Sequence, residues 1–304
     1  MNGLVISLQD AVVQGVLWGI MVLGVYITYK LLDIADLTVD GSFALGGCVC
    51  AIMVLVFKMD PWVALLIAGL AGMVAGAITG LLHTVFEIPA ILAGILTQIG
   101  LWSINLRIMS GKSNVPLLKT DTIVSKFIDF TGMNKQAASL IIGVGIAVIM
   151  IVVLYCFFGT EIGSAMRATG NNEAMVRALG VNTNWTKLLA LTISNGLVGI
   201  SGGLVCQSQK YADIGMGTGA IVIGLAAIVI GEVLMGKLRS FGSKLTSAVV
   251  GAVIYFVIRA VVLRMGMNAN DMKLLSAAIV AVALCVPVVL RKWRLKAAYT
   301  EGGE

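Results

Sequence analysis

The chain has 304 residues, of which 59% are hydrophobic and 12% charged, and its net charge is +6. Average soluble domains are about 45–50% apolar and about 25% charged, so a water-soluble enzyme and a disordered chain are both excluded. A β-barrel is excluded as well, because its strands alternate apolar and polar residues, whereas the apolar runs here are continuous. The composition predicts an all-α polytopic membrane protein embedded in a lipid bilayer.

Apolar runs that could cross the bilayer as helices recur about nine times, given that a transmembrane helix needs about 20 residues. The first has no basic region before it and no cleavage site after it, so it is predicted to be an uncleaved helix. The second is short and follows the polar stretch 36–42, which predicts a broken or re-entrant entry into the helix. The expected spans are 11–32, 41–57, 61–82, 88–109, 137–158, 185–206, 215–235, 243–263 and 272–290.

Lysine and arginine in short loops predict the orientation, because cytoplasmic loops are enriched in them. The tail 291–304 is basic, and so are the loops that follow the fifth and seventh spans. We therefore expect a cytoplasmic C-terminus and, with an odd number of spans, an external N-terminus. The chain 1–304 then forms one transmembrane domain with an outer loop at 110–136 and a large cytoplasmic loop at 159–184.

A faint internal repeat relates the two halves of the chain. The Ala-Asp pair at 35–36 and Gly47 match the pair at 212–213 and Gly224, each time just before an apolar run. The two copies are five spans apart, so a true repeat would be inverted in the membrane, with the substrate path at its interface. Alternatively, the matches are chance identities among common residues.

Glycines recur every four residues within several spans, which predicts close packing between helix backbones. Examples are Gly15 and Gly19, then Gly72, Gly76 and Gly80, then Gly199 and Gly203.

Polar residues at helical spacing mark possible inward faces, because polar side chains in a bilayer turn toward the bundle interior. The first span has Gln14 and Trp18 on one such face. These stripes could line a solute path, or they could bond a neighbouring helix instead. The candidate path residues are Asp36, Thr38, Asp40 and Ser42 of the broken stretch, Gln98, Trp102 and Asn105 of the fourth span, and Asn195 of the sixth.

Few ionisable residues lie inside the spans, and Glu232 and Arg259 are expected to form a structural ion pair. A carrier driven by an ion gradient usually has a buried carboxylate or histidine at mid-membrane, and none is evident. Gly111-Lys112-Ser113 lacks the glycine that a phosphate-binding loop needs five positions earlier. With no nucleophile motif and no metal-ligand spacing either, we expect no enzyme activity, metal or cofactor in this chain. Energy for uphill transport would come from another subunit.

The inner loop 159–184 is predicted to contain a short helix at 172–179. Asn171 or Asn172 can cap its start, Glu173 lies in its first turn, and Gly180 can end it. A short capped helix between two spans suits the docking of a soluble partner, although an amphipathic surface helix is the alternative.

Four segments together resemble the ABC-importer permeases of the branched-chain amino acid and ribose type. Residues 160–182 are similar to the coupling-helix segment of that family. The motifs at 36–47, 76–94 and 217–232 match further family segments in the same order. The chain departs from the sugar permeases at 231–236 and lacks the extra N-terminal helix of the ribose branch. In these respects it resembles a bacterial sub-branch associated with aromatic amino acid (tryptophan or tyrosine) uptake.

The resemblance implies a type II importer permease fold in the bacterial plasma (inner) membrane. It implies a permease homodimer, two cytoplasmic ATPase subunits that bind ATP and Mg, and an extracellular or lipid-anchored solute-binding protein, without nucleic acid. The permease would move a small polar solute, an amino acid and in this sub-branch an aromatic one, by alternating access. Matching positions for coupling to the ATPase are Gly170, Asn171, Asn172, Glu173, Ala174, Arg177, Ala178 and Gly180.

The alternatives are a sugar or nucleoside importer permease, a stand-alone secondary carrier or channel, and a non-transporting membrane enzyme or scaffold. An ion-driven carrier would transport solute by itself, whereas an importer permease would need its ATPase.

Overall fold

A computed structural model describes residues 2–118, 120–236, 240–266, 271, 274, 276–282 and 285. These residues are predominantly helical, and seven helices are long and apolar enough to cross a membrane. The seven correspond to the first six predicted spans and the eighth. Much of the ninth predicted span, 272–290, and the whole tail, 291–304, lie outside the described residues.

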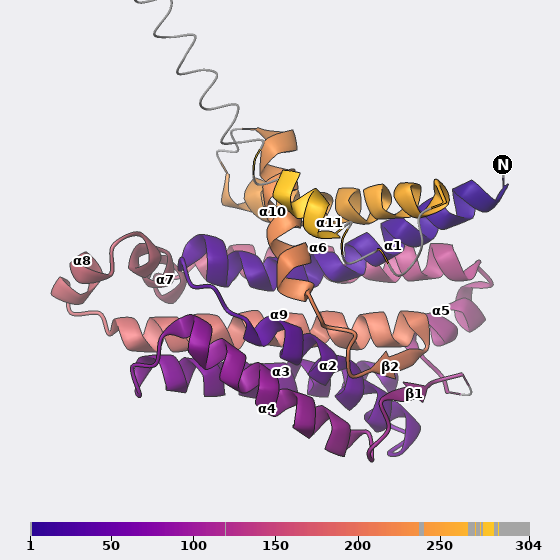
Figure 1. Ribbon diagram of the computed structural model, residues 1–304, viewed down its shortest axis with the longest axis horizontal. Coiled ribbons are helices and arrows are strands. Elements are labelled where there is room, and N and C mark those ends of the chain that lie inside the picture. The colour runs from indigo at the N-terminus through magenta and orange to yellow at the C-terminus, as the bar shows by residue number, and fades with distance from the viewer. Residues whose placement is uncertain are drawn as a thin grey trace, which may run out of the picture.

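The elements follow one another in a largely antiparallel bundle (Figure 1). They are α1 Asn2–Val25, η1 Tyr26–Leu31, α2 Thr38–Leu55, α3 Pro61–Thr84, α4 Ala90–Ile108, β1 Asn114–Pro116, α5 Ile123–Thr131, α6 Lys135–Gly159, α7 Glu161–Asn171, α8 Glu173–Ala178, α9 Thr183–Gln209, β2 Tyr211–Asp213, α10 Ala220–Met235 and α11 Phe241–Arg264.

Helix α9 is the centre of the bundle and packs against α1, α2 and α3. Its glycines bring the helix backbones together: an added Cβ on Gly199 would lie 2.6 Å from the carbonyl oxygen of Ala68 in α3. On the α3 side, an added Cβ on Gly72 or Gly76 would overlap backbone carbonyls of α9. The predicted close packing at these glycines is therefore confirmed, and the small side chains are what allow it.

Helices α1 and α11 form a second close antiparallel pair. An added Cβ on Gly15 would lie 2.5 Å from the Cα of Val253, and one on Gly19 would lie 2.9 Å from a methyl group of Val249. At the far end of the same pair, Arg264 donates hydrogen bonds to Ser7. These contacts fix the register of the pair, that is, which residues of α1 and α11 lie at the same level along the two helices.

Two helices begin after interruptions. The π-helix η1 extends α1 and is followed by residues 32–37, after which α2 starts; residues 214–219 likewise precede α10. The aspartates matched by the internal repeat share one local hydrogen bond: Asp36 accepts the N–H of Thr38 (2.9 Å) and Asp213 accepts the N–H of Gly215 (2.7 Å). Asp36 precedes α2, whereas Asp213 ends β2. Whether the halves form an inverted repeat stays a prediction.

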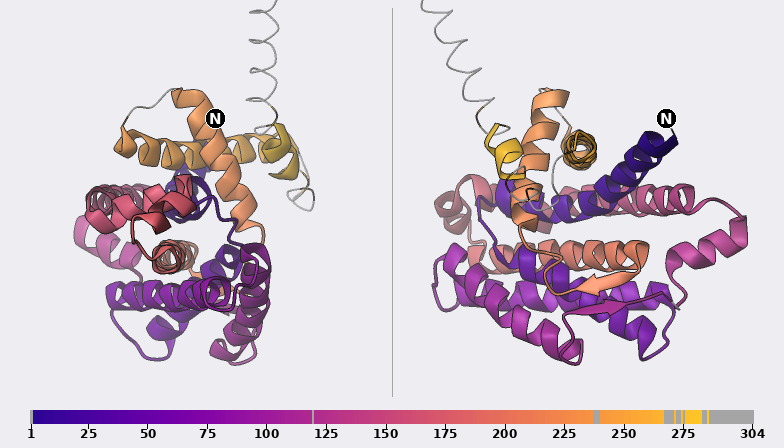
Figure 2. Two further views of the ribbon diagram at one scale, coloured as in Figure 1. Left: turned by 90° about the vertical axis from the view of Figure 1, so that its left-hand side faces the viewer. Right: turned by 45° about the vertical axis from the view of Figure 1, so that its right-hand side comes forward.

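The predicted seventh span, 215–235, was wrong in its first five residues. Helix α10 starts only at Ala220 and has 16 residues. The reason is a long-range contact: the backbone at Gly217 packs on the carbonyl oxygen of Asp40, and the Asp40 carboxylate binds the start of α10. Helix α10 also crosses α9 steeply (Figures 1 and 2).

The two ends of the bundle differ. Helices α7 and α8 lie at one end, while the N-terminus, α5 and the two strands lie at the other (Figures 1 and 2). The strands are antiparallel, with Val115 opposite Ala212. They join the segment after α4 to the segment after α9, so this sheet ties together distant parts of the sequence.

Candidate functional site

The segment 159–184, called the coupling segment below, folds into the two short helices α7 and α8. The predicted short helix is confirmed as α8, because Asn172 Oδ1 accepts the N–H of Met175 (3.0 Å) and Gly180 ends the turn with φ of 84°. Helix α7 was not predicted. Its local signal was nevertheless present, since Thr160 caps it by accepting the N–H of Gly163 and Glu161 follows in its first turn.

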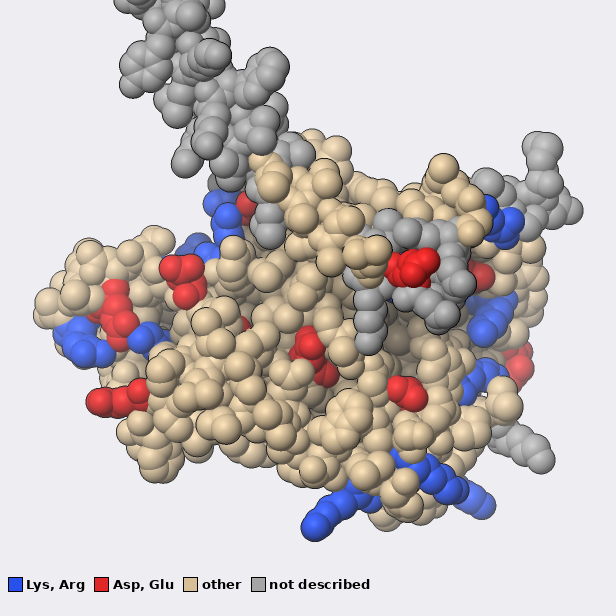
Figure 3. Space-filling model, viewed as in Figure 1, with Lys and Arg blue, Asp and Glu red and all other residues tan. Residues whose placement is uncertain are grey.

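Helix α8 displays most of its surface to solvent. Ala174, Arg177 and Ala178 are exposed, and only Val176 is buried. Asn171, Asn172 and Gly180 at its two ends are exposed as well. Charged side chains gather around this end of the molecule (Figure 3). The helix is thus a small, capped projection with alanines and an arginine available to a partner.

Glu173 ties α8 to the start of α9. It accepts hydrogen bonds from Lys187 (2.6 Å), Arg177 (2.9 Å) and Thr183 (3.1 Å). The pKa of Glu173 lies below its ordinary value, chiefly because of the hydrogen bond from Lys187, with the nearby positive charges adding to the effect. The projection is therefore held to the long central helix by a charged cluster.

We expect acid to loosen this cluster. A carboxylate whose pKa is lowered by folding stabilises the folded state at any pH above the pKa that it has in the unfolded chain, about 4.3 for glutamate. This stabilisation is lost as the pH falls through the lower pKa of the folded state. A spin label on Leu179→Cys, with the exposed Cys156 and Cys285 replaced by serine, should gain mobility as the pH falls below about 4. In Glu173→Gln the mobility should be high at every pH; an unchanged acid transition there would contradict the assignment to Glu173.

Gly170 brings the coupling segment against the end of the first span. An added Cβ on Gly170 would overlap the carbonyl oxygen of Leu31 and lie 2.8 Å from the Cα of Leu32. The preceding residue, Thr169 in α7, shares a buried hydrogen bond with Thr186 in α9 (3.1 Å). Helix α7 is thus held between η1 and α9, and η1 leads within a few residues to Asp36.

Asp36 is the centre of a buried polar network. Its side chain is almost entirely buried, and its Oδ2 accepts a hydrogen bond from Asn195 Nδ2 (2.7 Å). Next to it, Thr38 bonds Thr79 (2.7 Å), which in turn donates to Thr97 (2.9 Å). The network joins four helices, α2, α3, α4 and α9, at the point where α2 begins.

Asp40 caps a helix that lies far away in sequence. Its carboxylate accepts the N–H groups of Gly219 (2.8 Å) and Ile221 (3.0 Å) at the start of α10. A helix N-terminus has unpaired N–H groups and a partial positive charge, which a carboxylate satisfies. The two interrupted helices, α2 and α10, are therefore joined through this side chain.

Three buried oxygens near this network have no hydrogen-bond partner within the described part of the chain: Ser42 Oγ, Asn105 Oδ1 and Asn195 Oδ1. Buried polar atoms are normally paired, so these three are exceptions to that rule within the bundle. All three belong to residues that the sequence placed on the path.

Gln98, Trp102 and Asn105 share a face of α4, but the expectation that this face points inward was wrong for Trp102. Asn105 is 1% exposed and faces inward, Gln98 is half-buried, and Trp102 is 54% exposed. The buried face of α4 is centred on Leu101. Successive side chains on a helix point about 100° apart, so Trp102, the next residue, points to the outer surface.

The expected ion pair of Glu232 with Arg259 was also wrong. Glu232 instead pairs with Lys30 of η1 (2.9 Å), because the end of α10 meets the end of the first span. Arg259 lies toward the other end of α11, with its guanidinium 5.6 Å from the centre of the Phe256 ring. The Lys30 pair fastens η1 to α10 close to the place where the coupling segment touches η1.

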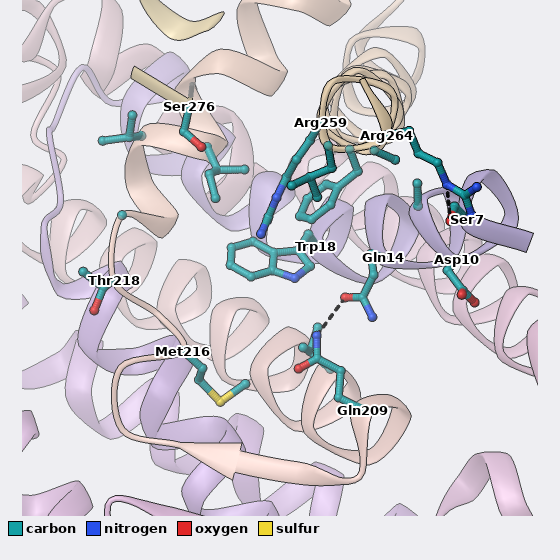
Figure 4. A pocket seen from close by; sticks show the side chains of 18 of the residues that line it. Ser7, Asp10, Gln14, Trp18, Gln209, Met216, Thr218, Arg259, Arg264 and Ser276 are labelled. Atoms are coloured by element: carbon teal, nitrogen blue, oxygen red, sulfur yellow. Dashed lines mark hydrogen bonds between the residues drawn. The ribbon is translucent and has the colours of Figure 1, made fainter. Parts of the chain in front are cut away.

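A cavity of about 1080 Å³ opens between α1, the end of α9, the interruption before α10, and α11 (Figure 4). None of the eight predicted path residues lines it, although Gln14 and Trp18 of the predicted first-span face do. Gln209 donates a hydrogen bond to Gln14 across it (3.2 Å). Arg259 also lines the cavity, although it was expected only as the partner of Glu232. Within the described residues, no group of three or more His, Cys, Asp or Glu side chains could hold a metal ion.

Comparison with known proteins gives a consistent result. A family model described as branched-chain amino acid transport system, permease component, matches residues 7–284. A tyrosine transport system permease protein of Clostridioides difficile is 38% identical over 88% of this chain and 86% of its own length. The ribose import permease protein RbsC of Escherichia coli K12 is 25% identical over 71% of this chain and 67% of its own length.

Among solved structures, a chain of PsaBC from Streptococcus pneumoniae in complex with Fab has a similar fold. The TM-score is 0.51 at 16% identity, and the match covers 90% of each chain.

Proposed function

The chain belongs to the family of permease components of branched-chain amino acid transport systems, and we propose that it imports an amino acid, driven by ATPase partners. The expected family and the all-α polytopic importer-permease fold are confirmed. It is a permease subunit of an ABC transport system. An amino acid as cargo is favoured by the 38% identity to a tyrosine permease, while the weaker similarity to ribose permeases supports a sugar as the second candidate.

The contact of Gly170 with Leu31 is the observation that supports coupling most directly. We place the α7–α8 end in the cytoplasm, where two ATPase subunits would dock on the exposed face of α8. ATP and Mg bind on those subunits. Movement of the docked segment would be transmitted to η1 through the contact of Gly170 with Leu31. From η1 it would be transmitted to α10 through the ion pair of Lys30 with Glu232. It would also be transmitted along the chain to residues 32–37, where Asp36 bonds Asn195.

The polar network and the capped start of α10 would form the moving part of the path. Asp36, Thr38, Asp40 and Ser42 lie at or just before the start of α2, and Asn195 joins them from α9. Gln98 and Asn105 lie on the neighbouring helix α4, whereas Trp102 would contribute only from the outer surface, where a second permease subunit could bring it to the path. The complex in the bacterial plasma membrane would comprise a permease homodimer and an external solute-binding protein.

Reconstitution tests this function. Proteoliposomes with the permease, its ATPase and its binding protein should take up radiolabelled tyrosine only when ATP is enclosed, and the permease alone should take up none. Uptake of ribose but not tyrosine would assign a sugar importer. Uptake by the permease alone under an ion gradient would assign a secondary carrier and overturn the proposal.

Arg177→Glu is expected to uncouple the transporter without unfolding it. The Arg177 side chain is 64% exposed, so its pair with Glu173 contributes at most about 0.5 kcal/mol to stability. The reversed charge would nevertheless face the docked ATPase and repel Glu173. ATP-driven uptake should fall at least about tenfold, a loss of about 1.4 kcal/mol, while thermal unfolding is nearly unchanged. The matched control is Arg107→Glu at the opposite end of the bundle, and equal uptake in both variants would contradict the coupling role.

A further inference from the structure

We propose that the cavity between α1, α9 and α11 binds the transported solute as an amino acid zwitterion, with Arg259 holding its carboxylate. The inference rests on the proposed import of an amino acid and adds the site and the chemical groups that recognise it. It uses residues that lie outside the polar network at the start of α2.

Arg259 is the anion-binding group of this site. Its side chain extends into the cavity toward the indole of Trp18 (Figure 4). Among the described residues no carboxylate pairs with it; its contact is with the face of the Phe256 ring. A half-buried cation within a membrane span is costly unless it meets a negative group. A guanidinium binds a carboxylate through two parallel hydrogen bonds, so a substrate carboxylate would supply the missing partner.

Asp10 supplies the opposite charge on the wall of the same cavity. In the antiparallel pair of α1 and α11, Gly15 lies against Val253 and Ser7 bonds Arg264, so the backbone of Asp10 in α1 is level with that of Arg259 in α11. The Arg259 side chain then runs along the cavity to Trp18 (Figure 4). Asp10 is exposed and lines the cavity. A substrate ammonium group would find acceptors on this wall of the cavity in the Asp10 carboxylate and the side-chain oxygens of Gln14 and Gln209.

Aromatic rings form the wall beside these charges. The rings of Trp18 and Phe256 lie 5.4 Å apart, and both side chains are buried by their neighbours except where they meet the cavity. Tyr211 lines the cavity from β2. Such a wall suits an apolar or aromatic side chain, and Gln14 and Gln209 add amide groups for a polar tip. A neutral sugar would leave Arg259 without a counter-charge, so this lining favours an amino acid.

Photoaffinity labelling of the complete transporter tests the site. The probe p-azido-L-phenylalanine, irradiated with the reconstituted complex, should label peptides from α1 near Trp18 and from α11 near Phe256. Excess L-tyrosine should suppress the labelling. Tyramine, which lacks the carboxylate, 3-(4-hydroxyphenyl)propionate, which lacks the ammonium group, and ribose should not.

Variants at the anion-binding group sharpen the test. Arg259→Met should weaken protection by L-tyrosine at least about tenfold, as expected for the loss of a charge-assisted hydrogen bond, and Arg259→Lys should weaken it less. The control Arg107→Met removes a cation outside the cavity and should leave protection unchanged. Label on other segments, no label, equal protection by ribose or tyramine, or full protection in Arg259→Met would each overturn the site.

ATP-driven uptake in the same preparations separates the two proposals. If tyrosine uptake proceeds while the label falls elsewhere, the importer function stands and this site is wrong. If no solute is taken up with ATP, the proposed function fails whatever the labelling shows.

Discussion

Gly170→Ala is expected to lower ATP-driven uptake strongly, by at least about fivefold, while the ATPase subunits remain bound and active. The added methyl group would overlap the carbonyl oxygen of Leu31, and because that oxygen belongs to the backbone, no side-chain rotation relieves the clash. Helix α7 must then separate from η1. Overpacking of this kind costs about 1–3 kcal/mol, which corresponds to roughly a 5- to 160-fold decrease in the rate of a coupled step.

The measurement compares uptake with ATP hydrolysis in the reconstituted complex. The matched control is Gly159→Ala in the same segment, because an added Cβ there has open space around it. We expect the control to transport normally. If Gly170→Ala transports as well as Gly159→Ala, the contact with η1 does not transmit the movement of the coupling segment.

Replacing Asp40 is expected to give the largest loss of stability. Asp40→Ala removes both acceptors from the start of α10, leaving the N–H groups of Gly219 and Ile221 unpaired in a partly buried setting. Hydrogen bonds to a charged group contribute about 1.5–3 kcal/mol each, so the loss should be about 3 kcal/mol or more. Asp40→Asn keeps one acceptor oxygen and should lose roughly half as much.

Thermal unfolding in detergent, followed by tryptophan fluorescence, measures this series. Asp129→Ala on the exposed face of α5 serves as the control for loss of a carboxylate. The expected order of unfolding temperature is wild type and Asp129→Ala highest, then Asp40→Asn, then Asp40→Ala. An Asp40→Ala variant as stable as the control would show that α10 does not depend on this cap.

Local sequence signals were sufficient to predict helix α8. Asn172, Glu173 and Gly180 each act on backbone groups within a few residues of themselves, so their order along the chain already predicts where α8 begins and ends. The four-residue spacing of glycines was informative for the same reason: it defines one face of a helix whatever that helix packs against.

Local sequence patterns gave wrong predictions where a side chain contacts a segment that is distant in the sequence. Glu232 was assigned to Arg259 on the grounds of charge and neighbouring spans, but its depth in the bundle brings it to Lys30. Trp102 was assigned by polarity and spacing, although only the packing of α4 on α2 and α3 decides which of its faces is inward. The start of α10 was placed too early because its cap, Asp40, is 179 residues away.

The order of residues by itself determined that the chain crosses a membrane as helices, that a short capped helix projects between two of them, and which family it belongs to. Each of these follows from run length, local capping or matching motifs. Only the tertiary structure decided that Gly170 touches η1, that Asp36 meets Asn195, and that a cavity collects Asp10, Trp18 and Arg259. These contacts depend on how each helix is rotated about its axis and how far it is shifted along the bundle. Many packings of the helices bury the same apolar residues, so the apolar pattern alone does not select one of them.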